Sequence, residues 1–515
     1  MTEYQRIAIA VVCSLLWLLW VVFLVVRQRR VQNAARRQQH TQAAGGVLIA
    51  FASQSGTAAS LAHQSAAHIG ASQPVTVLPL SQVSSQTLQT VHKALFVVAT
   101  YGEGEAPDNG RRFARNYLSG AGSDAVTLDL SHLSYSVVAL GDSTYERFCA
   151  FGQLLFDGMA QLGAKALEPL HKVDGAREDT SGVASVMPTW FRPLQPAEST
   201  TESSVSQPVI WWRLSERTLL NSGSPGAPLF ALTLRAVNDW PMWRAGDVLE
   251  VQPRHPREVV VAWLALHQLE ATEWIALGGR GQTLQAWLRD RVLPNADFDR
   301  EKLLRGDFSE FPLLPVREYS VASSCEEKAL KLIVRQQFRE GGQLGLGSGW
   351  LTEHCESGEL FAGRLRQNSN CHTPDHSRPM VLIGAGSGLA GLRAQLAERA
   401  ARPNSGPVWL VYGERCPEAD RPLAREIDNW LKQGTLTRCD RVFSRGKTEQ
   451  PRYVQEFLAT QQDALHAFVA RGADIYVCGN RSGMGVGVHR VLNQLLGEAE
   501  VSSMLDAGHY RRDLY

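Results

Sequence analysis

The alternation of short apolar runs with helical stretches between residues 46 and 193 is the feature that most restricts the fold. Near-continuous apolar strands separated by helices are typical of a parallel sheet that is covered on both faces. We therefore predict a doubly wound α/β domain over residues 46–193. Ligands of such sheets bind outside the carboxyl ends of the strands. The predicted strands are 47–53, 76–80, 94–100, 135–141 and 165–170.

The loop after the first run combines hydroxyl groups with a glycine. It reads Ser53-Gln54-Ser55-Gly56-Thr57-Ala58, and a helix is expected to begin near Ala59. Hydroxyls, a flexible backbone and the N–H groups of a helix N-terminus together suit a phosphate. The Gly-Lys-Ser/Thr sequence of a nucleoside-triphosphate loop is absent. Taken alone, the loop is equally compatible with an ordinary helix N-cap.

Two further strand ends place a tyrosine beside glycine-bearing backbone. A planar ring can lie between two tyrosine rings while backbone groups bind its edge. A lone loop tyrosine more often only covers apolar surface, but three such loops at one sheet edge favour a ligand site. The predicted binding residues in these two loops are Thr100, Tyr101, Gly102, Glu103, Gly104, Gly141, Asp142, Tyr145, Phe148 and Cys149.

These motifs resemble the FMN domain of the diflavin reductases, the family that contains cytochrome P450 reductase and the sulfite reductase flavoprotein. The resemblance rests on the segments SQSGTA, ATYGEGEAPDN and ALGDSTYERFC, in that order. It implies that residues 46–193 bind FMN. It also implies that Asp174, in the segment VDGARED, lies near the flavin.

The chain beyond residue 208 is predicted to form further domains. Residues 194–208 are rich in Ser, Thr, Glu and Pro and lack apolar periodicity, which indicates a linker. FALTLRAV and AGDVLEVQP have the pattern of strands, and amphipathic stretches follow at 258–270 and 283–293. We predict a β-barrel with a short helical insertion over residues 209–375.

Arg317 and Tyr319 lie two residues apart on a predicted strand and therefore point the same way. A guanidinium suits a pyrophosphate and a phenol suits ring stacking, although an exposed alternating strand would read the same. The strand and a later turn resemble the FAD-binding signatures R-x-Y-S and G-x-x-S of the ferredoxin–NADP reductase family. The resemblance implies a FAD site, with Ser320 near the flavin. The turn residues are Gly345, Leu346, Gly347 and Ser348.

The segment PMVLIGAGSGLAGLRAQL predicts a strand, a glycine turn and a helix in a last domain over residues 376–515. Its turn residues Gly384, Gly386, Ser387 and Gly388 suit a pyrophosphate. A plain dinucleotide-binding interpretation would give NAD, with Glu414 on the ribose hydroxyls. A later basic cluster favours NADPH, because two arginines and a hydroxyl suit a 2′-phosphate and a phenol suits adenine. The cluster comprises Ser444, Arg445, Arg452 and Tyr453.

This cluster resembles the NADPH-binding motif of the same family, which also implies roles for Arg415 and Gln455. One position departs from the motif, because Pro451 stands where relatives usually carry Lys, so Arg452 or Lys447 must replace it. The resemblance further places a cysteine beside the nicotinamide and an acidic residue and a final aromatic ring beside the flavin. The implied catalytic residues are Ser320, Cys478, Asp513 and Tyr515.

The N-terminus contains an unbroken apolar run at residues 7–26, long enough to cross a bilayer as a helix. We predict a retained anchor over 1–30, because no small-residue cleavage site follows, although a cleaved signal peptide is the alternative. Five arginines follow this run, in a basic stretch that includes the predicted juxtamembrane segment 31–45. The positive-inside rule then places the rest of the chain in the cytoplasm. The predicted location is the cell inner membrane, with a single span.

Composition excludes several other classes of function. The 52 Lys and Arg residues against 51 Asp and Glu residues give a net charge of +1, whereas a nucleic-acid binder needs a broad basic face. The eight cysteines form no C-x-x-C pair, which argues against zinc sites, iron–sulfur clusters and disulfide scaffolds and indicates a reducing compartment. We predict no metal site.

The resemblance covers residues 46–515 and implies an enzyme with FMN, FAD and NADPH as cofactors. We predict a membrane-anchored diflavin oxidoreductase of the NADPH–hemoprotein reductase type, which passes electrons from NADPH through FAD and FMN to a haem-containing or other redox protein, favoured as membrane-associated. The alternative is the flavoprotein alpha component of an NADPH sulfite reductase. A different class of function is a non-catalytic, flavodoxin-like binding scaffold at the membrane. The insertion before Arg317 is shorter than the connecting domain of P450-reductase-like relatives.

Overall fold

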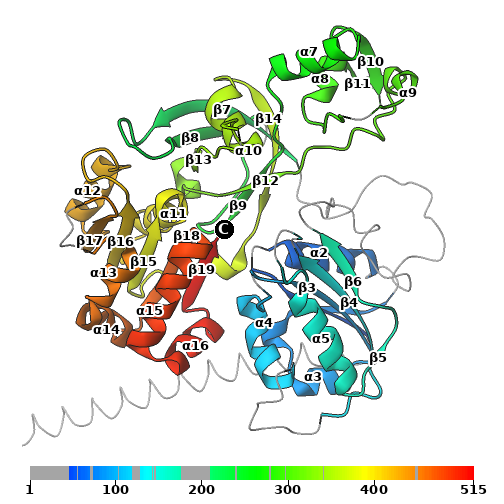
Figure 1. Ribbon diagram of the computed structural model, residues 1–515. Helices are drawn as coiled ribbons and strands as arrows, with labels where there is room; N and C mark the ends of the chain where they lie inside the picture. Colours follow the sequence, from blue (N-terminus) through cyan, green and yellow to red (C-terminus); the bar gives the residue numbers. More distant parts are fainter. Residues whose placement is uncertain are drawn as a thin grey trace, which may run out of the picture. The chain divides into compact units, whose positions relative to one another are not determined.

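The computed structural model divides the chain into two compact units (Figure 1). The first comprises residues 1–53 and 57–205, and the second comprises residues 54–56 and 206–515. The apolar span predicted at 7–26, the basic segment 31–45 and the predicted linker 194–208 lie outside the residues that it describes. The described residues are 46–54, 56–69, 73–102, 104–118, 128–141, 143, 146–174, 209–237, 240–277, 280–295, 297–339, 341–446 and 451–515.

The first unit is built on a parallel sheet with the strand order β2-β1-β3-β4-β5, in which β6 also pairs with β4. The four strands predicted nearest the N-terminus coincide with β1–β4. The strand predicted at 165–170 was too long. Pro169 has no N–H to donate to a neighbouring strand, and the structure has a short β5, which ends before Pro169, and a separate β6, which begins after it. The strands are β1 (Val47–Ala52), β2 (Val75–Pro79), β3 (Lys93–Ala99), β4 (Ser134–Gly141), β5 (Lys165–Ala166) and β6 (His171–Asp174).

Helices cover both faces of this sheet. Successive side chains of a strand point to opposite faces, so Ile49 packs in one apolar cluster with Leu61 of α2. Leu48 packs in the other cluster, with Phe113 of α4 and Phe151 of α5. The predicted doubly wound α/β fold is confirmed. The helices are α2 (Thr57–Ile69), α3 (Ser85–Thr90), α4 (Asp108–Phe113) and α5 (Ala150–Gln161).

The second unit begins with a six-stranded sheet of order β12-β9-β14-β7-β8-β13, in which every pairing is antiparallel. Its core is rich in large aromatic side chains, among them Trp212, Trp350 and Phe361. The strands are β7 (Ile210–Leu219), β8 (Leu229–Ala236), β9 (Val248–Val251), β12 (Arg317–Ser320), β13 (Leu330–Arg335) and β14 (Leu360–Arg366). A short helix, α10 (Leu346–Gly349), precedes β14.

A small subdomain with its own apolar core is inserted between β9 and β12. Val260, Leu264 and Phe311 belong to that core. The two amphipathic stretches predicted as helical contain α7 (Arg257–Leu266) and α8 (Leu284–Leu288). The sequence patterns did not predict the remaining elements, which are too short to show a clear period: the hairpin β10 (Trp274–Leu277) and β11 (Arg280–Thr283), and the helix α9 (Arg300–Leu304).

The second unit ends with a parallel sheet of order β17-β16-β15-β18-β19. The strand order reverses on either side of β15, so the loop after β15 lies at the switch point where such sheets bind ligands. The strands are β15 (Met380–Ala385), β16 (Val408–Glu414), β17 (Arg438–Phe443), β18 (Asp474–Gly479) and β19 (Tyr510–Leu514).

The helices of this last region cover both faces of the sheet (Figure 1). Leu392 of α11 and Trp430 of α12 pack on one face. Leu458 of α13 and Val488 of α15 pack on the other. The helices are α11 (Leu389–Ala400), α12 (Ala424–Gln433), α13 (Val454–Ala459), α14 (Gln462–Ala470), α15 (Val486–Leu496) and α16 (Glu498–Asp506).

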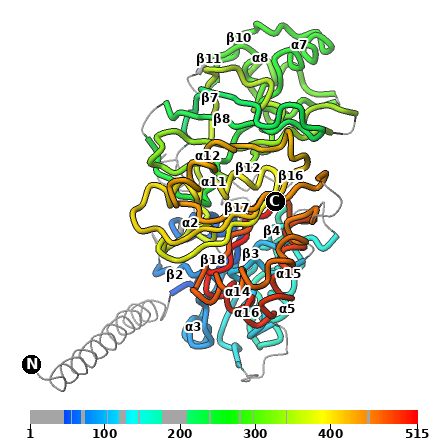
Figure 2. The backbone as a smooth tube through the Cα atoms, turned by 90° about the vertical axis from the view of Figure 1, so that its left-hand side faces the viewer, coloured from blue at the N-terminus to red at the C-terminus, as the bar shows by residue number. Residues whose placement is uncertain are grey.

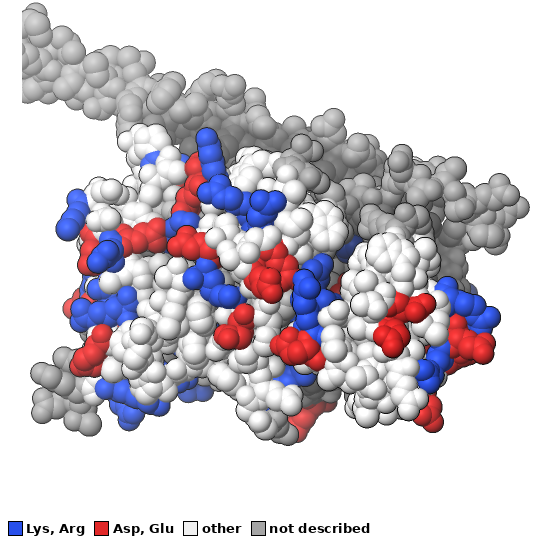
Figure 3. Space-filling view, turned by 90° about the horizontal axis from the view of Figure 1, so that it is seen from above, with Lys and Arg blue, Asp and Glu red and all other residues white. Residues whose placement is uncertain are grey.

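The predicted transmembrane helix at 7–26 lies outside the described residues. Within the described ranges, no helix has both the length and the apolar composition that a membrane span requires. On the face of the molecule seen in Figure 3, basic and acidic side chains are intermixed, and no broad surface of one sign is visible there.

Candidate functional site

In the first unit, hydrogen bonds connect the loops at the carboxyl ends of the strands. The Ser53 N–H donates to Asn109 Oδ1 at 2.9 Å, which joins the loop after β1 to the start of α4. The Phe151 N–H donates to Thr100 Oγ1 at 3.3 Å, which joins the loop after β3 to α5. The Ser143 N–H donates to Asp174 Oδ1 at 3.1 Å, which joins the loop after β4 to the last residue of β6. Four strand ends therefore form one rim.

The backbone of this rim is held in conformations that glycine favours. Tyr101 and Glu105 exchange two backbone hydrogen bonds of 2.8 Å, which closes a tight turn with Gly102 and Gly104 at positive φ. A Cβ atom on Gly141 would lie 2.8 Å from the Cys149 sulfur, so a side chain cannot be accommodated there. The loops expected to bind a planar ring are thus tightly folded.

The residues predicted to hold the phosphate lie where β1 gives way to α2. Ser53 is buried, Gly56 has a φ of +101°, and Thr57 and Ala58 begin the helix. The first N–H groups of a helix have no acceptor within the helix, and the helix dipole adds positive potential. With the two hydroxyls, this donor set fits the phosphate of FMN. Gln54 lies in the same loop and Phe148 beside Gly141, whereas Ser55, Glu103, Asp142 and Tyr145 lie outside the described residues.

In the second unit, the R-x-Y-S strand and the G-x-x-S turn pack against each other. A Cβ atom on Gly347 would lie 2.5 Å from Arg317 Cγ and 2.9 Å from the Tyr319 hydroxyl, so only glycine fits between them. The Ser348 hydroxyl accepts from the Gln337 N–H at 3.0 Å and fixes the turn, which Gly345 and Leu346 open. The arrangement presents a guanidinium, a phenol and turn backbone together, and this donor set fits FAD.

Three donors from two sheets meet at one oxygen of Asp513. Ser320 donates its hydroxyl hydrogen to Asp513 Oδ2 at 2.9 Å from β12 of the antiparallel sheet. The Cys478 thiol and the Tyr476 hydroxyl donate to the same oxygen at 3.3 Å each, from β18. We call these four residues the Asp513 cluster. It contains three of the four predicted catalytic residues, and Tyr476, which the sequence did not single out.

The charge state of the Asp513 cluster follows from its surroundings. Burial raises the pKa of Cys478 and of Tyr476 well above their ordinary values, so both keep their protons near neutral pH and act as donors. Burial also raises the pKa of Asp513, while the hydrogen bonds from its three donors lower it in part. The cluster therefore holds a carboxyl whose protonation depends on its hydrogen bonds.

The fourth predicted catalytic residue, Tyr515, lies beside the glycine turn. Its hydroxyl and that of Ser387 are joined by a hydrogen bond of 3.0 Å. The chain end lies next to β12 and the parallel sheet in both backbone views, in agreement with the Ser320–Asp513 hydrogen bond (Figures 1 and 2). The turn itself is narrow, because a Cβ atom on Gly388 would lie 2.1 Å from the Cys478 carbonyl oxygen and one on Gly384 2.5 Å from it.

Glu414 does not face outward as the NAD interpretation requires. Its side chain is 3% exposed, and its Oε1 atom accepts from Arg335 Nη2 at 2.7 Å. The same oxygen lies 2.8 Å from the Tyr412 hydroxyl. Because internal partners occupy this carboxylate, the arrangement disfavours recognition of ribose hydroxyls by Glu414.

The predicted 2′-phosphate residues gather at the carboxyl ends of β16 and β17. Arg452 Nε donates to the Ser444 carbonyl oxygen at 3.0 Å. The backbone N–H of Arg445 donates to the carbonyl oxygen of Arg415 at 2.7 Å. Tyr453 is the N-cap of α13 and is 48% exposed, and Gln455 lies in the first turn of that helix. Lys447 lies outside the described residues. These hydrogen bonds join the segments that follow β16 and β17, while the guanidinium of Arg415 lies against Gly226, where an added Cβ atom would be 2.7 Å from its Nη1.

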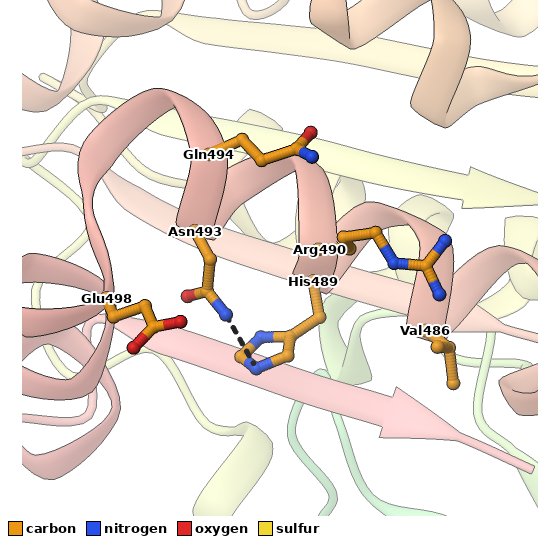
Figure 4. A pocket seen from close by; sticks show the side chains of 6 residues that line it. All are labelled: Val486, His489, Arg490, Asn493, Gln494 and Glu498. Carbon is orange, nitrogen blue, oxygen red and sulfur yellow. Dashed lines mark hydrogen bonds between the residues drawn. The ribbon is translucent and has the colours of Figure 1, made fainter.

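One shallow depression lies elsewhere, on the outer side of α15 and the start of α16. It has a volume of about 430 Å³ and is lined by Val486, His489, Arg490, Asn493, Gln494 and Glu498 (Figure 4). Its one internal hydrogen bond, between Asn493 and His489, is 3.4 Å long. None of the predicted site residues lines it.

Known proteins resemble both units. The flavodoxin family matches residues 49–185, and the oxidoreductase NAD-binding domain family matches residues 382–490. The sulfite reductase (NADPH) flavoprotein alpha-component of Bacillus subtilis is 26% identical, over 91% of this chain and 89% of that protein. The proteins of the same name from Vibrio cholerae O395 and Shewanella oneidensis are 27% and 28% identical, over 94% and 88% of this chain and 90% and 85% of theirs.

These comparisons correct the predicted location. The relatives that match almost the whole chain are sulfite reductase flavoprotein alpha-components, and the described residues contain no membrane-spanning helix, so the prediction of an inner-membrane protein with a single span is wrong. An apolar run of sufficient length permits a span but does not by itself establish one.

The predicted cofactors, FMN, FAD and NADPH, are confirmed, and so is an oxidoreductase that uses them. The two family matches fall, in order, on the two parallel sheets, and the relatives match across the antiparallel sheet that separates them. Together, the two domain matches and the relatives that match almost the whole chain support the diflavin reductase family.

Proposed function

We propose that this protein is the flavoprotein component of an NADPH sulfite reductase-type system and delivers electrons from NADPH to a haem-containing partner protein. The proposal is supported by the names and the coverage of its relatives. In the structure, the transfer of electrons from NADPH to FAD is supported by the Asp513 cluster, because it joins the predicted FAD strand to the predicted NADPH sheet through Ser320, Asp513 and Cys478. The choice of acceptor rests on the relatives.

Each cofactor is assigned to the residues whose chemistry suits it. FMN is assigned to 46–193, FAD to 209–375 and NADPH to 376–515. When bound, the flavins supply the redox chemistry, which is acceptance of a hydride from NADPH and release of single electrons to an acceptor. Arg317 and Tyr319 hold the FAD, and the turn at Gly386 holds the pyrophosphate of the coenzyme. Arg445 and Arg452 bind the 2′-phosphate of NADPH by charge-assisted hydrogen bonds.

The protein contributes position and charge at the point of transfer. Ser320 and Cys478 are neutral donors held at the carboxyl end of the parallel sheet, and Asp513 fixes both. Tyr515 covers the site through its contact with Ser387 and must move aside when the nicotinamide enters. The narrow glycine turn brings backbone N–H groups close to the coenzyme without a side chain between them.

A general NADPH–hemoprotein reductase is the second candidate, because the fold and the Asp513 cluster suit it equally. The two differ in the acceptor. A non-catalytic scaffold is disfavoured, because a binding scaffold has no need for the intact Asp513 cluster.

The purified protein tests the proposal directly. We expect one FMN and one FAD per chain, bleaching of the flavin absorbance by NADPH, and fast reduction of a sulfite reductase haemoprotein. Equal rates with cytochrome c and slow reduction of the haemoprotein would favour the second candidate. Protein that folds but binds a single kind of flavin, or that NADPH does not bleach, would overturn the proposal.

A further inference from the structure

We propose that Tyr476 is a positioning residue for hydride transfer, because its hydroxyl holds the Asp513 carboxylate in place between Ser320 and Cys478. This inference rests on the proposed function. Tyr476 lies two residues before Cys478 on β18, so both side chains point to the same face of the sheet, toward α11. Its hydroxyl lies 3.3 Å from Asp513 Oδ2.

The number of donors at this oxygen supports a role for Tyr476. Ser320, Tyr476 and Cys478 all donate to Asp513 Oδ2, whereas a carboxylate oxygen has two lone pairs. The three donors therefore compete for two lone pairs on Asp513 Oδ2. When the Ser320 hydroxyl turns toward the flavin, the Tyr476 hydroxyl can keep the carboxylate in place and compensate its charge.

The packing around Tyr476 shows that the cluster converges on one point. A Cβ atom built on Gly391 would lie 2.8 Å from the Cys478 sulfur, 2.9 Å from the Tyr476 hydroxyl and 3.1 Å from Asp513 Oδ2. The three polar atoms thus meet directly above the backbone of α11. Tyr476 is fully buried, so its ring has no freedom to leave the carboxylate.

The groups that act on Asp513 come from three strands besides its own. Ser320 and Glu318 lie on β12, Arg366 on β14, and Tyr476 and Cys478 on β18. The tyrosine is a neutral donor to the ionised carboxylate and stabilises that form. Its removal should therefore raise the pKa of Asp513 and weaken the hold on Ser320.

The test is the variant Tyr476→Phe in the full-length holoenzyme. Flavin bleaching is followed by stopped flow with NADPH and with NADPH deuterated at the transferred position, across the pH range. We expect hydride transfer to slow about three- to tenfold, the isotope effect to rise, the KM for NADPH to stay unchanged and the acid limb of the pH profile to move to higher pH. A rate, isotope effect and pH profile equal to wild type would overturn the proposal.

Two controls separate positioning from stability. Tyr135→Phe removes another buried tyrosine hydroxyl, which donates to the Phe156 carbonyl at 2.7 Å in the first unit, and should leave hydride transfer unchanged. Fluorotyrosine placed at position 476 is a stronger donor of the same shape and should move the acid limb to lower pH. A shift in the same direction as Tyr476→Phe would contradict the inference.

Measurements on the wild-type protein distinguish a failure of the proposed function from a failure of the role of Tyr476. If NADPH does not bleach its flavins, the proposed function fails and this inference fails with it. If the wild type is bleached and Tyr476→Phe behaves identically, only the role of Tyr476 is overturned.

Discussion

At the scale of single residues, the site depends on places where a side chain is absent. Gly347, Gly388 and Gly391 each lie where a Cβ atom would collide with a functional group. In a core packed at native density, neighbouring atoms can move little. The effect of a glycine-to-alanine substitution on stability and activity therefore depends on which atoms the added methyl group contacts. At Gly391 it meets the Asp513 cluster.

We expect Gly391→Ala to slow flavin reduction by NADPH about tenfold or more and to lower the free energy of unfolding by about 1–3 kcal/mol, because three fixed polar atoms must shift. Stopped-flow bleaching and thermal unfolding measure the two effects. Gly483→Ala is the matched control, since its Cβ atom would lie 3.7 Å from the nearest atom. Wild-type rates in Gly391→Ala would show that the cluster tolerates displacement.

The coenzyme preference also belongs to individual residues. Arg445→Ala should raise the KM for NADPH about tenfold or more and leave that for NADH nearly unchanged, because only NADPH carries the 2′-phosphate. Steady-state kinetics with both coenzymes measure this. Glu414→Gln should not create a preference for NADH, since Arg335 and Tyr412 already occupy the carboxylate. Equal losses with both coenzymes in Arg445→Ala would refute the assignment.

At the scale of elements, α11 joins the two sheets of the second unit. Its Arg393 forms ion pairs with Glu327, next to β13, and with Glu426 on α12. Burial by itself would raise the pKa of Glu327, but the hydrogen bonds and charges of Arg393 and Lys331 outweigh burial and lower it to about 2. The ionised form of Glu327 is therefore more favoured, relative to the protonated form, in the folded protein than in the unfolded chain.

Because the pKa of Glu327 is lowered on folding, its contribution to stability is present above an unfolded pKa of about 4.5 and is lost as the pH falls toward about 2. We expect Glu327→Gln to destabilise the second unit near neutral pH and to have little effect near pH 2. Urea unfolding at several pH values measures the difference. Lys302→Gln, which removes an exposed charge, is the control. If Glu327→Gln lowered the free energy of unfolding equally at all pH values, the loss of stability would not come from the ionised carboxylate of Glu327.

At the scale of the whole molecule, the two units have separate apolar cores. Asp174 is part of the first unit alone, where it accepts from the Ser143 N–H. Damage to the rim of the first unit should therefore leave the second intact.

We expect Asp174→Ala to lose FMN while it retains FAD and its bleaching by NADPH, and to reduce the haemoprotein partner poorly. Flavin released by heat and separated by chromatography gives the two occupancies. Asp157→Ala, on the exposed side of α5, should retain both flavins. Simultaneous loss of FMN and FAD from Asp174→Ala would show that the units depend on one another.

Local patterns in the sequence were sufficient for the doubly wound fold of the first unit and for proposing a candidate site. Apolar runs identified β1–β4, and loop motifs such as Ser53–Thr57 and the glycine turn are recognisable because their candidate binding groups lie in adjacent residues. Short elements were predicted poorly, because few residues show little periodicity: the strand at β5 was predicted too long, and the hairpin β10–β11 was not predicted. The inner-membrane location failed for a different reason, since it rested on one apolar run and on no contact within the fold.

The longer apolar strands and the loop motifs could thus be predicted from the sequence itself, because hydrophobic period and turn chemistry are properties of neighbouring residues. Which side chains share an acceptor was decided only by the tertiary structure. Tyr476, Arg335 and Tyr412 lie on strands that look like ordinary core, and their partners Asp513 and Glu414 are fixed by strand order and sheet packing. A hydrogen bond between residues remote in the chain leaves no local pattern, so only the folded arrangement reveals it.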